Sequence, residues 1–208
     1  MDLSDPIHSV ISSVQGDVLV ALARSGQLLS ARGVAELVSD RASPSGVKAA
    51  LRSLVASGLV TGEPHPPVIL YRLNRRHLAA DGIEPLANLR GRLIDSMREH
   101  IAAWTAPSRG AYLFGSTARS EGNVESDRDV LVVRPEGCDP DDPTWLGQLH
   151  DFASDVTAWT GNDCRIIESS EKEVGVLLAT SDPLAKDLRS DAIIFAGRHL
   201  ARLAPLSQ

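Results

Sequence analysis

Two aspartates separated by a single residue are the side chains in this sequence best placed to do chemistry. Asp127 and Asp129 flank Arg128 and come immediately before an apolar run at residues 130–133. Because side chains alternate between the two faces of a strand, we expect both carboxylates on the same face. Two like charges held this close are costly unless a cation lies between them. The pair therefore predicts a divalent-metal site.

A glycine and a serine follow another apolar run a short distance upstream. Residues 111–114 are Ala-Tyr-Leu-Phe, and Gly115 and Ser116 come directly after them. Gly115 lets the backbone pass close to a phosphate, and Ser116 offers a hydroxyl and an amide at the start of a helix. The two aspartates offer the oxygen ligands that suit Mg²⁺, an ion that commonly bridges substrate phosphates. The predicted order of strand, Gly-Ser turn, helix, loop, Asp-x-Asp and strand thus indicates chemistry on a metal-bound phosphate.

This stretch resembles the minimal nucleotidyltransferases of the DNA polymerase β superfamily, and the resemblance covers roughly residues 86–200. The matching motif residues are Gly115-Ser116-Thr117-Ala118-Arg119 and Ser126-Asp127-Arg128-Asp129-Val130-Leu131-Val132. The resemblance implies transfer of a nucleoside monophosphate from an NTP to an acceptor, with release of pyrophosphate. By position it implies that Gly115 and Ser116 bind the triphosphate and that Arg119 supports its phosphates. It also implies that Asp127 and Asp129 bind Mg²⁺ or Mn²⁺ and are catalytic.

The sequence departs from the family pattern at Arg128, because an apolar residue usually lies between the two aspartates. We expect the Arg128 side chain to point away from the metals. Either that face of the strand is exposed to solvent, or Arg128 has an acidic partner such as Glu125.

The second departure concerns a third carboxylate, which the superfamily places on the next strand. That strand is predicted at residues 164–167, after a helix that ends at Gly161. Asp163 precedes the strand and Glu168 follows it, and alternation places these two acids on opposite faces. Asp163 shares the face of Arg165, near which we expect the acid, and is the predicted third catalytic residue. Glu168 is the alternative, and a site with two carboxylates is the remaining one, which would lack an obvious general base.

Three short helices and a hairpin are predicted in the first eighty residues. Apolar spacings of three and four residues predict helices from Val10 to Ser25, from Ser30 to Val38, and from Ser43 to Gly58. Ser43-Pro44 suits a helix start, because serine caps and proline fits the first helical position. Two short strands are predicted at 59–61 and 68–73. This pattern resembles the winged helix-turn-helix of bacterial regulators, in which Leu-x-x-Leu-x-x-x-Gly-Leu-Val leads into the wing, as residues 51–60 do here.

In such folds the third helix enters the major groove of DNA, and residues near its N-terminus contact bases. The predicted DNA-binding residues are Ser43, Ser45, Lys48 and Arg52. Beside the wing, Arg72, Arg75 and Arg76 are available to phosphates. The alternative is a dimerisation or protein-docking module with solvated charges, and Glu63 in a wing turn without Lys or Arg weakens the case for DNA.

The predicted domains are residues 1–80, the winged helix-turn-helix, and residues 81–208, the nucleotidyltransferase domain. Residues 74–85 are polar and contain Gly82 and Pro85, which favours a boundary there. A long amphipathic helix is predicted at 86–104. It is suited to packing on the second domain, to bridging the two domains, or to forming the seam of a homodimer. The predicted fold class is α+β, with a mixed sheet packed by helices in the second domain.

Composition is that of a globular chain, with 208 residues of which 43% are hydrophobic and 23% charged. Net charge is −6, and residues 1–80 are weakly basic whereas residues 81–208 are acidic. The two domains are therefore suited to different partners. No apolar run is long enough to span a bilayer, and no basic stretch marks a secretory signal, so we expect a cytoplasmic protein without a membrane partner. The six histidines lack ligand spacing, and Cys138 and Cys164 form no metal or disulfide set.

Three functions are compatible with these motifs. The first is a Mg²⁺-dependent nucleotidyltransferase that uses an NTP and is recruited to DNA by its winged helix. The second is a DNA-binding transcriptional regulator whose nucleotidyltransferase-like domain senses a nucleotide without turning it over. The third, suggested by the family resemblance, is a component of a toxin–antitoxin pair.

Overall fold

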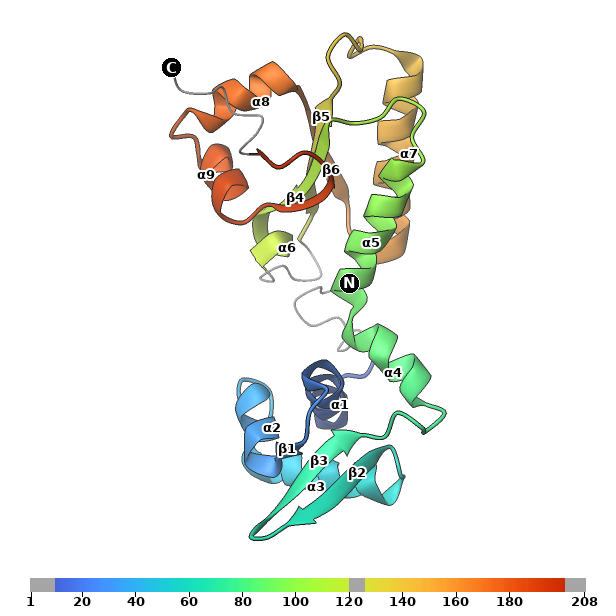
Figure 1. The fold of residues 1–208 in the computed structure, drawn as a ribbon, viewed down its shortest axis with the longest axis vertical. Coiled ribbons are helices and arrows are strands. Elements are labelled where there is room, and N and C mark those ends of the chain that lie inside the picture. Colours follow the sequence, from blue (N-terminus) through green and yellow to red (C-terminus); the bar gives the residue numbers. More distant parts are fainter. Residues whose placement is uncertain (1–9, 120–125, 201–208) are drawn as a thin grey trace. The chain divides into compact units, whose positions relative to one another are not determined.

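A computed structural model of the chain describes residues 10–119 and 126–200. The chain forms two compact units that divide between Arg90 and Gly91 (Figure 1). Within the described residues, every helix is too short or too polar to cross a membrane.

The first unit combines helices with a small antiparallel sheet. Its elements are α1 (Val14–Ser25), β1 (Leu29–Ser30), α2 (Ala31–Leu37), α3 (Pro44–Ala56), β2 (Val60–His65), β3 (Val68–Leu73) and α4 (Ala80–Ala87). The strand order is β1-β3-β2, and both pairs are antiparallel. Serine side chains cap the first three helices, since Ser13, Ser30 and Ser43 each accept a hydrogen bond from the backbone N–H three residues on. The apolar faces of these helices meet in one core that includes Val18, Leu51 and Leu54.

The segment between the units differs from the prediction of one continuous helix. Helix α4 lies largely in the stretch predicted to be a polar linker, and α5 (Leu89–Ala102) begins after a break at Asn88. Asn88 has φ −116° and ψ 29°, outside the helical region, and Pro85 supplies no N–H to the turn before it. Ile83 of α4 packs into the core of the first unit, whereas Met97 of α5 packs into that of the second.

The second unit is built on a four-stranded mixed sheet in the order β6-β5-β4-β7. Its strands are β4 (Gly110–Phe114), β5 (Arg128–Arg134), β6 (Cys164–Ser170) and β7 (Ile193–Gly197). Strand β4 pairs antiparallel with both β5 and β7, whereas β5 and β6 are parallel. Helix α7 (Pro143–Thr160) makes the crossover that a parallel pair needs.

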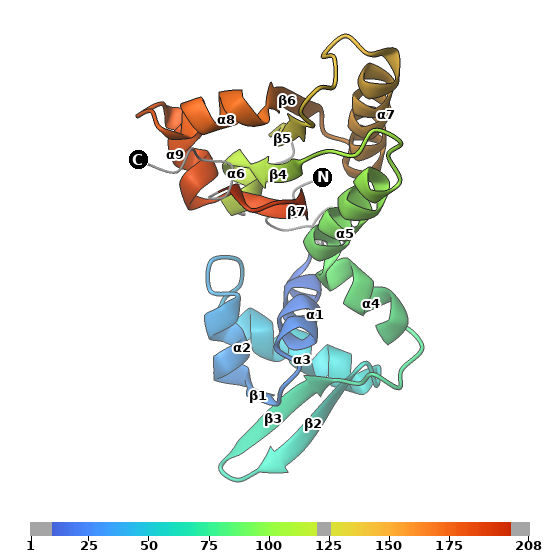
Figure 2. The ribbon, with the colours of Figure 1, turned by 45° about the horizontal axis from the view of Figure 1, so that its top comes forward.

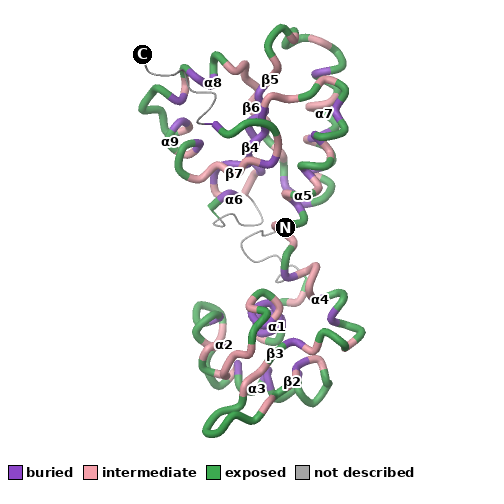
Figure 3. The backbone as a smooth tube through the Cα atoms, in the orientation of Figure 1, coloured by how far each residue is buried: buried purple, intermediate pink, exposed green. Residues whose placement is uncertain are grey.

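Helices cover both faces of this sheet (Figure 2). Helices α5 and α7 pack on the face that carries Leu113, Val130 and Val132. Helices α8 (Glu171–Leu178) and α9 (Pro183–Ser190) pack on the opposite face, beside Leu131 and Val133. Strands β4 and β5 are consequently the most buried part of the unit (Figure 3). The mixed sheet packed by helices confirms the predicted α+β class.

Candidate active site

The junction between β4 and the short helix α6 (Gly115–Arg119) places a glycine against a carboxylate. Phe114 pairs with Asp129 across the β4–β5 ladder, so the chain turns into α6 directly beside Asp129. Gly115 has φ +71°, and a Cβ built on it would lie 2.8 Å from Oδ2 of Asp129. The position therefore needs glycine for two reasons, its backbone conformation and its lack of a side chain.

Asp127 immediately precedes β5 and Asp129 is its second residue, and both side chains are half-buried. Asp129 shares the sheet face of Leu131 and Val133, which α8 and α9 cover. Burial raises the pKa of Asp129, and the neighbouring charge of Asp127 raises it further. Arg165 and Arg128 partly offset this effect. A carboxylate whose ionisation is disfavoured by burial and by a neighbouring acid is a place where added positive charge is favourable.

The donor set suits a hard divalent cation that is shared with a substrate. Asp127 and Asp129 offer carboxylate oxygens, which Mg²⁺ and Mn²⁺ accept, and Gly115 leaves the space beside Asp129 free of a side chain. Among residues 10–119 and 126–200, no group of three or more His, Cys, Asp or Glu side chains could hold a metal. A cation here would therefore take most of its ligands from water and from the phosphates of a substrate.

An arginine stands opposite Asp129 on the neighbouring strand. In the parallel β5–β6 pair, Asp129 is in register with Arg165. Nε of Arg165 lies 2.8 Å from Oδ2 of Asp127, although the Arg165 side chain is 72% exposed. The strand position that faces the acid pair therefore carries a positive charge.

The two acids predicted as the third carboxylate have different surroundings. Asp163 is exposed and precedes β6, and its backbone carbonyl accepts a 2.7 Å hydrogen bond from the Arg128 N–H. Glu168 is in register with Val132 and forms a 2.6 Å ion pair with Arg134. Neither acid belongs to a three-residue group with Asp127 and Asp129 in the part of the chain that the structure describes.

Arg128 is fully buried, with 0% of its surface exposed. The solvent-exposed alternative for its face of the strand is therefore wrong, and Glu125, the acid considered as its partner, lies outside the described residues. Its Nη1 donates to Oγ1 of Thr117 at 2.9 Å and to the carbonyl of Ser126 at 3.0 Å. The guanidinium thus ties α6 to the start of β5, the two elements that carry the motif.

Arg119, predicted to support phosphates, joins the end of α6 to α9. Its Nη1 lies 3.4 Å from Oδ2 of Asp191 and 3.6 Å from Oδ1 of Asp187. The charge of Asp187 also contributes to the raised pKa of Asp129. Arg165 and Asp187 are therefore members of the site that motif spacing did not identify, since only the strand register and the return of α9 bring them there.

The predicted DNA-binding residues lie together on α3 of the first unit. Ser45, Lys48 and Arg52 are exposed, and the last two are one helical turn apart. Within the described part of the chain, neither Lys48 nor Arg52 has an ion-pair partner. Ser43 caps the helix through Gly46 N–H at 3.2 Å and bonds Ser45 at 3.1 Å, so its hydroxyl is already engaged.

Of the arginines beside β3, two are neutralised by acids. Arg72 lies 2.7 Å from Glu63, and Arg75 lies 2.6 Å from Glu84. Arg76 has no side-chain ion pair with another described residue. Of the three arginines, it is therefore the strongest candidate to bind a DNA phosphate.

Comparison with known proteins gives only distant similarities. No protein-family model matches the chain, and no curated protein sequence matches it. It is similar to a solved toxin–antitoxin structure with AMP-PNP, at 15% identity and a TM-score of 0.38, over 53% of this chain and 80% of that one. It is also similar to a mutant of the toxin–antitoxin pair MntA–HpeT, at 14% identity and a TM-score of 0.37, with the same coverage.

Proposed function

We propose that the second unit is a nucleotidyltransferase that transfers a nucleoside monophosphate from an NTP to an acceptor and releases pyrophosphate. The observation that carries this proposal is the contact between Gly115 and Asp129. A glycine with positive φ leaves an uncovered backbone beside the Asp129 carboxylate, and this is the arrangement that a phosphate and its cation require.

Each residue of the site has a role in this proposal. Asp127 and Asp129 hold Mg²⁺ or Mn²⁺, which when bound offsets charge on the triphosphate and on the leaving pyrophosphate. Gly115 and Ser116 admit the triphosphate to the start of α6, and Arg119 supports it from the end of that helix. Arg128 holds α6 against β5, so that these groups keep their spacing.

Label transfer tests the proposal directly. The full chain is incubated with Mg²⁺ and each α-³²P-labelled NTP, and transfer to protein or nucleic-acid acceptors is measured. D127N and D129N should each abolish transfer while the protein stays folded, because asparagine keeps the shape but not the charge. E168Q is the matched control, since Glu168 pairs with Arg134 away from the site, and it should retain transfer. Transfer that survives in D127N and D129N would contradict the proposal.

Asp163 is the sequence candidate for a third acid, and D163N decides its role. Because Asp163 is exposed and lies outside the acid pair, we expect D163N to retain most of the transfer rate. A loss as large as that of D129N would instead identify Asp163 as the group that accepts the proton of the acceptor hydroxyl.

We further propose that the first unit is a winged helix-turn-helix that binds DNA through α3. Its order of helices, the β1-β3-β2 sheet and the exposed charges of Lys48 and Arg52 support this assignment. A regulator that senses a nucleotide without catalysis is the second candidate, favoured by the cation, Arg165, that faces the acid pair. Nucleotide-dependent binding to a specific duplex, without label transfer to any acceptor, would identify the regulator.

A further inference from the structure

The acid pair has two guanidinium neighbours with different freedom to move. Arg128 is fully buried and is fixed by Thr117 and by the Ser126 carbonyl. Arg165 has 72% of its side chain exposed, and its partner among the described residues is Asp127. Arg128 is therefore a permanent charge beside the acids, whereas Arg165 can leave at small cost, because exposed ion pairs contribute little to stability.

Arg165 competes with a cation for the same carboxylate. Its Nε lies 2.8 Å from Oδ2 of Asp127, so that oxygen is already occupied and a positive charge already adjoins the site. A divalent ion that approaches Asp127 meets the repulsion of this guanidinium unless the side chain moves away. Binding of a metal ion alone is consequently opposed by the chain itself.

A phosphate removes this conflict, because it offers Arg165 a new partner. Guanidinium groups bind phosphate oxygens strongly and often through two parallel hydrogen bonds. The strand register fixes the backbone of Arg165 opposite Asp129, so a phosphate held at the acid pair is within reach of the Arg165 side chain after it rotates.

We propose that Arg165 is an exchangeable counter-ion, which passes from Asp127 to a nucleotide phosphate when metal and nucleotide bind together. This inference rests on the proposed nucleotidyltransferase function and adds a substrate-binding residue to it. It makes metal and nucleotide binding mutually dependent, since each ligand relieves the cost that Arg165 imposes on the other.

Binding measurements on the full chain test the exchange without reference to activity. Free Mn²⁺ is followed by electron paramagnetic resonance in the absence of nucleotide, and binding of the α,β-methylene analogue of each NTP, which cannot be transferred, is followed by calorimetry with Mn²⁺. We expect R165Q to bind Mn²⁺ alone about 3- to 5-fold more tightly, because the competing cation is gone. We expect it to bind the Mn²⁺-analogue about 10-fold more weakly, because a charge-assisted bond to phosphate is lost.

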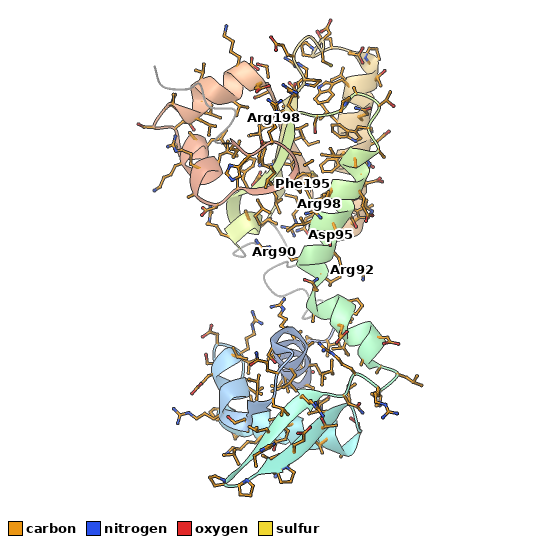
Figure 4. All side chains as sticks on the ribbon, in the orientation of Figure 1. Arg90, Arg92, Asp95, Arg98, Phe195 and Arg198 are labelled. Atoms are coloured by element: carbon orange, nitrogen blue, oxygen red, sulfur yellow. The ribbon has the colours of Figure 1, made fainter. Side chains whose placement is uncertain are left out.

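Two further variants serve as a control and as an independent test of the exchange. R98Q is the matched control, because Arg98 is also an exposed arginine in an ion pair, with Asp95 on α5 (Figure 4), and it should leave both affinities unchanged. D127N releases Arg165 from its acidic partner, so the analogue without metal should bind more tightly than it does to the wild type.

The outcomes separate the exchange from the function on which it rests. Tighter binding of Mn²⁺ together with weaker binding of the Mn²⁺-analogue by R165Q supports the exchange, and the reverse pair of changes would overturn it. Changes of the same sign, or no change, in a protein whose wild type binds Mn²⁺ and the analogue would overturn the exchange and leave the nucleotidyltransferase proposal standing. A wild type that binds neither ligand would overturn both.

Discussion

Gly115→Ala separates the backbone role of this glycine from its role beside Asp129. A residue with a side chain at φ +71° costs about 1–2 kcal/mol of folding free energy. The added Cβ would also lie 2.8 Å from Oδ2 of Asp129, too close for an unchanged carboxylate. Because that oxygen is the end of a side chain, it can move away at little further cost in stability. The displacement falls on a proposed metal ligand, so function should suffer more than folding.

Gly137→Ala is the matched control for this experiment. Gly137 has φ +81°, and a Cβ built on it meets nothing within 4 Å. Urea unfolding should show similar losses of about 1–2 kcal/mol for both variants, since both pay the same backbone cost. Mn²⁺ affinity should fall in G115A alone, together with an about 10- to 100-fold drop in label transfer, because small misplacements of catalytic groups are costly.

The comparison of G115A with G137A tests the assigned cause, because both variants carry the same backbone cost and only Gly115 adjoins a carboxylate. Equal loss of Mn²⁺ binding in G115A and G137A, or wild-type transfer by G115A, would refute the claim that the Gly115–Asp129 approach shapes the site.

Three other perturbations have defined outcomes. Because the pKa of Asp129 is raised, its ionisation destabilises the folded state, so D129N should be more stable than the wild type at pH 7. This difference in unfolding free energy should shrink as the pH falls toward about 4, because Asp129 then becomes protonated. Urea unfolding at several pH values measures the difference. K48A/R52A should weaken DNA binding and lower the slope of log K against log salt by about 2, measured by fluorescence anisotropy, whereas R92A/R98A, which removes two charges from α5, should not. Burial raises the pKa of the Cys164 thiol to about 12, so iodoacetamide at pH 8 should leave Cys164 unmodified in the folded protein, as peptide mass spectrometry would show.

Local patterns predicted most of the elements. The cap at Ser43-Pro44 begins α3, and the predicted strand at 68–73 coincides with β3. In the second unit, the helix expected to end at Gly161 is α7, which Gly161 caps, and the strand predicted at 164–167 lies within β6. These signals are short-range, since each depends on a cap, a proline or a period of apolar residues.

The features that were missed depend on contacts between distant residues. The two-residue strand β1 exists because Leu29 and Ser30 pair with β3, which no local pattern reveals. The ion pair of Arg165 with Asp127 requires the β5–β6 register, since a shift by one residue would place Arg165 on the other face. The burial of Arg128 could not be predicted from the sequence, because it depends on Thr117 and Ser126 accepting hydrogen bonds from its guanidinium.

The place of β7 at the edge of the sheet has a consequence for how the protein is made. Gly110, at the start of β4, is paired with Gly197, at the end of β7, so the sheet joins segments that are far apart in the chain. A ribosome must synthesise α9 and β7 before this ladder can close, and pairings between such distant residues form slowly. During that interval the Gly115 turn and its aspartates lack the support of α9. The proposed site is therefore complete only after β7 has emerged from the ribosome.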